Sequence, residues 1–376
     1  MNKKEALYPS ISCFAFNGDN SRVAICPNNS TVHIYDTCGK PEDYKAWKKT
    51  DQELLEHDLL VSSIDWAPKT NRILTCSQDI NAYVWCEEEE EYKDKATGDM
   101  KKRMVWNQKL VVLKTNRAAA VCKWSPDESV FAVGTAATEL GICTFDKTND
   151  WWSAKNIRKF ASTVTCCDWH PTNEKEILAG GTDSRVRGFQ CQKKKQPCGL
   201  KYNTSGWVLD VKFSPSGSFF AVTLQSSTIV VYPYTPDFEN THEENNGVEI
   251  PLPTLPCTQL LFVRDDLIVG IGHEYSPILI KKSGDSWEYV GRCDRGQLTK
   301  AKSTSSVRNA FKKFGANKGK STEGKGIAAT RHKAAINSVR PTERDSNNNI
   351  VKFVTGGVDG RFCSWDVSSL EKDVEM

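Results

Sequence analysis

The chain has 376 residues, of which 39% are hydrophobic and 26% are charged, so it is long and apolar enough to bury a large core. Its longest apolar runs have the length of strands, which excludes a helix that spans a membrane. The formal charge of +3 is uneven, because residues 296–333 hold ten Lys and Arg residues against one Glu, a local charge of +9.

The first segment, residues 1–12, reads MNKKEALYPSIS and contains no apolar stretch long enough for a secretion signal. We expect it to form a strand that pairs with the last of the repeats described next, because such closure removes exposed sheet edges. Without a secretion signal, the 14 cysteines are expected to stay free thiols in a reducing compartment.

A turn residue, followed six positions later by an aromatic or aliphatic residue that closes a short strand, recurs seven times. Short strands separated by turns indicate an all-β protein, and recurrence at about 40 to 50 residues indicates a propeller or a solenoid. We predict one domain over residues 1–376, a seven-bladed WD-repeat β-propeller. The pairs are Asn29 and Tyr35, Asp79 and Trp85, Glu139 and Phe145, Asp183 and Phe189, Ser226 and Tyr232, Glu274 and Ile280, and Asp359 and Trp365.

Two repeats carry a fuller set of polar residues. The first set is His57, Thr75, Asp79 and Trp85, and the second is His332, Thr355, Asp359 and Trp365. A His and Asp pair could serve acid–base catalysis, but a catalytic pair is normally singular, whereas this one recurs at blade positions. We therefore interpret both sets as hydrogen-bonded chains that brace a blade, with each bond contributing about 1 kcal/mol.

No motif for catalysis or cofactor binding stands in the sequence. The Gly-rich stretches GGTDSRVRG and GGVDG are blade turns, and neither leads into a helix as a phosphate-binding loop does. No Cys-x-x-Cys pair occurs, and the six His residues are scattered singly, so no zinc-binding spacing can be drawn. We expect no enzymatic activity, no cofactor and no metal.

Residues 87–106, EEEEEYKDKATGDMKKRMVW, change from acidic to basic along their length. We expect a solvated loop between the third and fourth strands of the second blade, with its opposite charges paired to each other. A loop that binds a partner is the alternative.

Residues 295–333 delay the seventh repeat, and we predict a flexible, basic insert between blades six and seven. Within it, residues 305–315 read SSVRNAFKKFG, where a Ser N-cap and the final Gly would bound a short helix. On a helical wheel, this segment has an apolar side and a basic side. The apolar side contains Val307, Ala310, Phe311 and Phe314, and the basic side contains Arg308, Lys312 and Lys313.

A lone helix of this length is marginal in water, so we expect it to dock in a hydrophobic groove of a partner. Docking on its own propeller is one alternative. Nucleic acid is another, although stacking on bases favours aromatic residues spread along a groove. Contact with an anionic membrane is the third, but the segment is short and lacks Trp.

Five stretches carry a more specific pattern than a generic blade. They are AICPNNSTVHIYD (24–36), NRAAAVCKWSPDESVFAVG (116–134), NDWWSAKNIRKFASTVTCCDWHP (149–171), SGWVLDVKFSPSGS (205–218) and TGGVDGRFCSWDVSSLE (355–371). Through these stretches the chain resembles, nearly end to end, the family of WD-repeat subunits (subunit 1) of the actin-related protein 2/3 complex. The position of the insert, between blades six and seven, also matches that family.

The resemblance implies a non-catalytic structural subunit of a seven-protein assembly that nucleates branched actin filaments, located in the cytoplasm at the actin cytoskeleton. Its partners would be two actin-related proteins, four small subunits, the actin filament and nucleation-promoting factors, with neither nucleic acid nor membrane insertion. Carried over by position, Val307, Phe311 and Phe314 would enter a groove on actin of the mother filament. Arg308, Lys312 and Lys313 would lie on the polar side of that helix.

The alternative is an independent WD-repeat adaptor whose basic arm binds nucleic acid or another acidic partner. Binding to phosphates weakens steeply with salt concentration, whereas docking through Phe side chains should weaken little, so a salt series separates the two functions.

Overall fold

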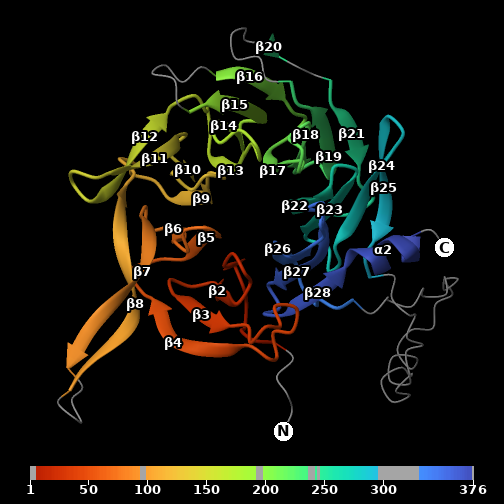
Figure 1. Ribbon diagram of the computed structural model, residues 1–376. Helices are drawn as coiled ribbons and strands as arrows, with labels where there is room; N and C mark the ends of the chain where they lie inside the picture. Colours follow the sequence, from red (N-terminus) through yellow and green to blue (C-terminus); the bar gives the residue numbers. More distant parts are fainter. Residues whose placement is uncertain are drawn as a thin grey trace, which may run out of the picture.

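The computed structural model describes residues 6–93, 99–191, 198–235, 242–243, 246–294 and 330–374. Its strands follow one another around a ring as seven antiparallel blades (Figure 1). The predicted all-β propeller is therefore confirmed.

The strands of the first four blades have the following bounds. Blade one contains β1 (Cys13–Phe16), β2 (Arg22–Cys26), β3 (Val32–Asp36) and β4 (Lys48–Leu54). Blade two contains β5 (Val61–Trp66), β6 (Ile73–Ser77), β7 (Ala82–Lys93) and β8 (Met100–Val112). Blade three contains β9 (Ala119–Trp124), β10 (Val130–Thr135), β11 (Leu140–Asp146) and β12 (Trp151–Ile157). Blade four contains β13 (Val164–Trp169), β14 (Glu176–Gly181), β15 (Arg185–Gln190) and β16 (Cys198–Asn203), with β20 (His242–Glu243) added at its edge.

The last three blades complete the ring. Blade five contains β17 (Val208–Phe213), β18 (Phe219–Leu224), β19 (Thr228–Pro233) and β21 (Val248–Pro251). Blade six contains β22 (Cys257–Arg264), β23 (Leu267–Gly272), β24 (Ile278–Ser283) and β25 (Ser286–Arg292). Blade seven contains β26 (Ile336–Arg344), β27 (Ile350–Gly357) and β28 (Phe362–Asp366), and the helix α2 (Val367–Val374) follows.

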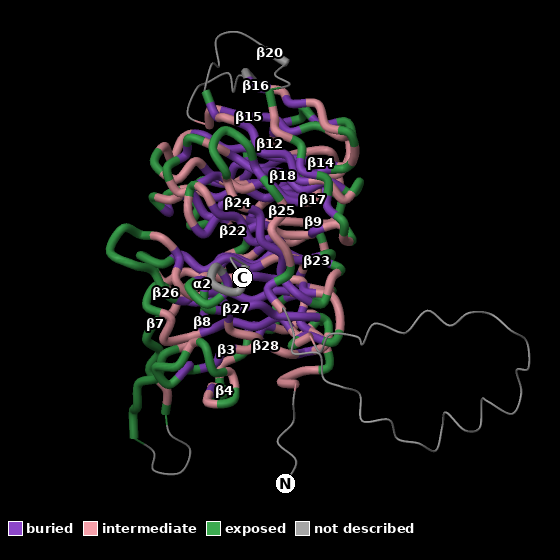
Figure 2. The backbone as a smooth tube through the Cα atoms, turned by 90° about the vertical axis from the view of Figure 1, so that its right-hand side faces the viewer, coloured by how far each residue is buried: buried purple, intermediate pink, exposed green. Residues whose placement is uncertain are grey.

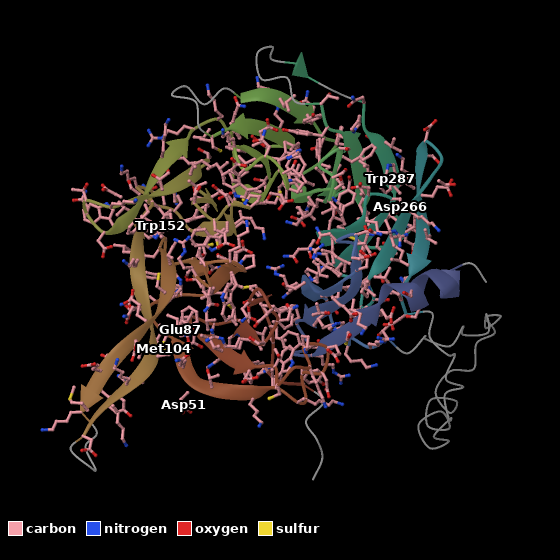
Figure 3. All side chains as sticks on the ribbon, viewed as in Figure 1. Asp51, Glu87, Met104, Trp152, Asp266 and Trp287 are labelled. Atoms are coloured by element: carbon pink, nitrogen blue, oxygen red, sulfur yellow. The ribbon has the colours of Figure 1, made fainter. Side chains whose placement is uncertain are left out.

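Burial falls from the inner strands to the rim. The second strand of a blade is buried along its whole length in β6 and β14, whereas β4 at the rim is mostly exposed. Figure 2 shows the buried positions along the strands and the exposed ones in the connections. Side chains fill the space between neighbouring blades, so the core is a series of clusters that each join two blades (Figure 3). β-Branched and aromatic residues suit these sheets, because both of their faces are covered.

Residues 87–93 and 100–106 form the two strands of a projecting hairpin and not the loop that the sequence predicted. The register of β7 with β8 continues from Glu87 and Trp106 to Lys93 and Met100. Opposite charges do pair across it, with Lys102 at 2.9 Å from Glu89 and Arg103 at 2.7 Å from Glu90. Facing and diagonal residues of two antiparallel strands lie close enough for such pairs, which explains why an acidic run and a basic run can form one hairpin.

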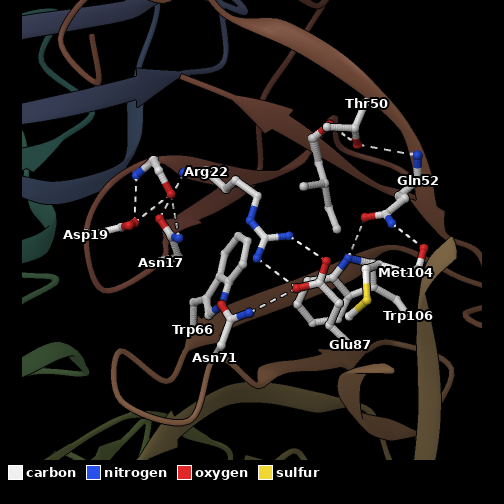
Figure 4. Close-up of polar contacts among 12 residues, drawn as sticks. Asn17, Asp19, Arg22, Thr50, Gln52, Trp66, Asn71, Glu87, Met104 and Trp106 are labelled. Atoms are coloured by element: carbon white, nitrogen blue, oxygen red, sulfur yellow. Dashed lines mark hydrogen bonds and ion pairs between the residues drawn. The ribbon is translucent and has the colours of Figure 1, made fainter. Parts of the chain in front are cut away.

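Blade one holds the base of this hairpin (Figure 4). The guanidinium of Arg22 donates two hydrogen bonds of 2.8 Å to the carboxylate of Glu87. Gln52 accepts a hydrogen bond from the indole of Trp106 at 2.9 Å and donates one to the Met104 carbonyl at 2.7 Å. On the other side, β8 pairs in parallel with β12, so blades two and three form one eight-stranded sheet.

The strand expected at the start of the chain is wrong for residues 6–12, and residues 1–5 lie outside the described ranges. The segment crosses the turn between β27 and β28, where the Leu7 amide donates to Gly360 at 2.9 Å and the Ile11 amide donates to Gly357 at 3.2 Å. Pro9 has no N–H to donate, so a regular ladder cannot run through this segment. Side chains seal the ring instead, with Phe14 of blade one against Phe362 of blade seven at 5.1 Å between ring centroids.

Candidate functional site

The polar residues of blade two form a continuous buried chain. His57 lies in the connection before β5, with one ring nitrogen 2.8 Å from the Asp79 carboxylate and the other 2.8 Å from the Thr75 hydroxyl. The Trp85 indole N–H donates to the same hydroxyl at 2.9 Å. Burial lowers the pKa of His57, and the nearby Asp79 only partly opposes this effect, which favours the neutral imidazole.

Blade seven repeats the arrangement. His332 lies 3.1 Å from Asp359 and 2.8 Å from the Thr355 hydroxyl, which accepts a hydrogen bond of 2.8 Å from Trp365. Burial alone would raise the pKa of Asp359, but hydrogen bonds from His332 and from the Lys333 amide outweigh it and hold that pKa below its ordinary value. The structure thus brings together the four residues of each polar set, one set in blade two and the other in blade seven.

The order carboxylate, imidazole, hydroxyl resembles the relay of a nucleophilic enzyme. Here the Thr75 and Thr355 hydroxyls are 0% exposed, and each already accepts an indole N–H. A substrate therefore cannot reach either hydroxyl. The geometry suits a brace that ties the connection before a blade to its second and third strands.

Two further blades carry a related brace that the sequence analysis did not recognise. In blade four, Asp183 accepts the Ala161 amide at 3.0 Å and pairs with Arg187 at 2.8 Å. In blade six, Glu274 accepts the Leu255 amide at 3.2 Å and pairs with Arg292 at 2.7 Å. The spacing of six positions before a strand-closing residue located both acids, but no His marks their brace in the sequence.

Carboxylates join three pairs of neighbouring blades at the central channel, which has a volume of about 870 Å³. In each pair, an Asp on the innermost strand of one blade accepts a hydrogen bond from a backbone amide of the following blade. The pairs are Asp65 with Trp124 at 2.9 Å, Asp168 with Phe213 at 3.0 Å and Asp210 with Leu260 at 2.8 Å. Burial alone would lower the pKa of Lys212, but Asp168 and Asp210, at 3.7 and 3.6 Å, raise it.

This channel has the chemistry of a structural interface, because its charges neutralise each other. Within the described residues, no three His, Cys, Asp or Glu side chains are grouped so that they could hold a metal ion. None of the helices in those ranges has the length and apolar content to cross a bilayer.

The predicted partner-binding residues of the insert lie outside the described residues. They are Val307, Arg308, Phe311, Lys312, Lys313 and Phe314. The two ends of the insert are joined at its base, where the Asp294 carboxylate accepts the Arg331 amide at 2.9 Å. The Arg331 guanidinium lies 4.4 Å from the centroid of the Trp365 ring.

His332 and Lys333, assigned to the insert from the sequence, are held by blade seven. His332 is buried in its brace, and the Lys333 amide donates to Asp359 at 2.6 Å. The basic run continues through Lys333, although the backbone of that residue is held by the blade.

Comparison with known proteins gives the family. The WD domain, G-beta repeat family matches residues 48–86 and 154–189, each span covering the outer strand of one blade and the inner strands of the next. The chain is 33% identical to actin-related protein 2/3 complex subunit 1A-A of Xenopus laevis, over 100% of this chain and 99% of that one. It is 32% identical to subunit 1 of Schizosaccharomyces pombe over 93% and 95%, and 30% identical to subunit 1A of Arabidopsis thaliana over 97% and 96%. The chain therefore belongs to the family of actin-related protein 2/3 complex subunit 1.

Proposed function

We propose that this chain is a non-catalytic structural subunit of an actin-related protein 2/3 complex and supports the nucleation of branched actin filaments. The observation that carries the proposal is the relationship to subunit 1 of that complex over nearly the whole length of both chains. Its partners would be two actin-related proteins, four small subunits, nucleation-promoting factors and the actin filament, in the cytoplasm at the actin cytoskeleton.

The physics of the ring supports a scaffold. A buried, satisfied hydrogen-bond network costs free energy to disrupt, so the braces of blades two and seven and the carboxylate contacts between blades favour one arrangement of the blades. A rigid ring presents its rim and connections at fixed positions, which is what an assembly of several subunits requires. The buried hydroxyls of Thr75 and Thr355 provide no chemistry to a substrate.

The insert is the part that we propose to contact actin of the mother filament, through Val307, Phe311 and Phe314. The clamp between Asp294 and Arg331 supports this proposal, because it brings both ends of the insert to one point of the ring. Residues between these ends can then reach a partner without disturbing the blades.

The test is recovery of the tagged chain from a lysate of its own cells, with its partners identified by mass. Recovery of two actin-related proteins and four smaller proteins in equal amounts would support the proposal. Recovery of ribosomal or chromatin proteins would favour the adaptor with a basic, nucleic-acid-binding arm. Recovery of the chain alone would contradict the proposal.

A further inference from the structure

One exposed surface combines aliphatic side chains with acidic ones. Leu55 and Leu59 are 59% and 53% exposed in the connection from β4 to β5, and Ile80 is 43% exposed in the turn from β6 to β7. Glu56 and Asp58 stand between the leucines in the sequence and are exposed too. We name these five residues the acidic apolar patch.

The patch is held in place by the brace of blade two. The Asp58 amide donates to Asp79 at 3.0 Å, and the Gln78 amide donates to the Leu60 carbonyl at 3.0 Å. The Ser77 hydroxyl donates to the Leu59 carbonyl at 3.0 Å. Connection and turn therefore form one rigid unit. Its two leucines are exposed, whereas His57, which lies between them in the sequence, is buried. A fixed group of exposed aliphatic side chains indicates a contact surface.

The charge of the patch selects the chemistry of its occupant. The carboxylates of Glu56 and Asp58 have no cation within ion-pair distance among the residues that the structure describes. They also lie close to Asp79, whose carboxylate is already hydrogen-bonded to His57. A ligand for this surface should therefore present an apolar stripe flanked by cations.

The chain itself contains such a ligand, because residues 305–315 place their apolar residues on one side of a helical wheel and their basic residues on the other. The insert joins β25 to β26, as the segment with Leu55 joins β4 to β5. Every such connection, from the outer strand of one blade to the inner strand of the next, lies on the same face of the ring. The base of the insert, at Asp294 and Arg331, and the patch thus lie on the same face of the ring.

The insert is long enough to span the gap. Its base lies between blades six and seven, and the patch lies between blades one and two, so two blades separate them (Figure 1). Sheets stack at about 10 Å, so this path measures about 20 to 30 Å. Residues 295–304 alone can extend over about 33 Å.

We propose that the acidic apolar patch binds residues 305–315 of the same chain. Phe311 and Phe314 would cover the aliphatic side chains, while Arg308, Lys312 and Lys313 would lie beside Glu56 and Asp58. The segment would occupy the patch in the free chain and leave it when it contacts actin; only this second consequence rests on the proposed function.

Another exposed apolar pair on the same face provides a matched control. Leu255 and Tyr275 of blade six are exposed to a similar extent, at 55% and 49%. They lie nearer to the base of the insert, but the acid beside them, Glu274, is already paired with Arg292 at 2.7 Å. If proximity and apolar surface alone governed docking, this control pair would be preferred.

The experiment uses the full chain with the photo-crosslinking residue p-benzoylphenylalanine at position 314, irradiated at high dilution. The crosslinked residues are identified by peptide mass. We expect links within one chain to residues 55–60 and 78–81. The triple variant Leu55→Ser, Leu59→Ser, Ile80→Ser should lower the yield of these crosslinks by about tenfold, because loss of about one buried aliphatic side chain is sufficient to change the docking equilibrium by that factor. The double variant Leu255→Ser, Tyr275→Ser should leave the yield unchanged.

A charge exchange tests the electrostatic part. Glu56→Lys with Asp58→Lys should lower the yield, and adding Arg308→Glu, Lys312→Glu and Lys313→Glu should restore it, which a folding defect would not do. Links to Leu255 or Tyr275, links only between two chains, or no links at all would each overturn the proposal. Recovery of the complex from lysate is independent of this result, so a failure here and a failure of the proposed function are distinguishable.

Discussion

Replacing Thr75 by Val tests whether the brace of blade two holds the fold. The two side chains have nearly the same shape, but Val lacks the hydroxyl that contacts both His57 and Trp85. The substitution leaves an indole N–H and an imidazole nitrogen buried without their partner. Each such group costs about 1–3 kcal/mol, so we expect the free energy of unfolding to fall by about 2–6 kcal/mol.

Thr223→Val is the matched control. Thr223 is also fully buried in the second strand of a blade, but its hydroxyl makes a single hydrogen bond, to the Cys257 carbonyl at 2.7 Å. Its loss should cost about 1 kcal/mol. The equivalent brace residue in blade seven, Thr355, should behave as Thr75 does. Since the two braces share no hydrogen-bond partner, the costs of Thr75→Val and Thr355→Val should add.

The assay is equilibrium unfolding in urea, followed by circular dichroism and by Trp fluorescence. The free energy of unfolding is compared for the parent chain, the three single variants and the double variant. A loss for Thr75→Val no larger than the loss for Thr223→Val would refute the reasoning, because the brace would then contribute no more than an isolated hydrogen bond.

Three further predictions concern other parts of the chain. Burial lowers the pKa of His57 below the unfolded value of about 6.5, so its contribution to the free energy of unfolding is fully present above that pH and is lost as the pH falls below it. His57→Asn should reduce this loss, measured by urea unfolding at pH 7 and pH 5.5. Replacing residues 90–103 by a two-residue Asn-Gly turn should change the free energy of unfolding by less than about 1 kcal/mol, because it keeps the Met104 carbonyl that binds Gln52 and removes, among the described residues, only side chains that are exposed or half-buried. A larger loss would show that the end of the hairpin supports folding. Phe311→Ala with Phe314→Ala should leave the chain folded and weaken cosedimentation of the assembly with actin filaments by about 2–4 kcal/mol, whereas unchanged cosedimentation would reject these two anchors.

The sequence by itself was sufficient for features that depend on short separations along the chain. The spacing between a turn residue and the residue that closes its strand follows from local backbone geometry, so it located Asp79 and Trp85, and Asp359 and Trp365, without knowledge of the fold. It also singled out His57 and His332, because both recur at the same place in their repeats.

Other features depended on contacts between distant segments, which the sequence does not encode as a pattern. An acidic run and a basic run in 87–106 were compatible with a loop or a hairpin, and the hairpin was decided by Arg22 and Gln52 of blade one, which hold its base. The braces of Asp183 and Glu274 were missed because their partners are arginines and backbone amides at variable separations.

The sequence alone determined the repeat, the all-β class and the family resemblance, because short-range periodicity and specific stretches carry that information. Only the tertiary structure decided how the ring closes. Residues 6–12 cross the turn of blade seven without forming a strand, since Pro9 interrupts a ladder and aromatic contacts around Phe14 already seal blade one to blade seven. It also decided that Asp294 and Arg331 meet, because joining the two ends of a long insert requires the blades on either side of it to be in place.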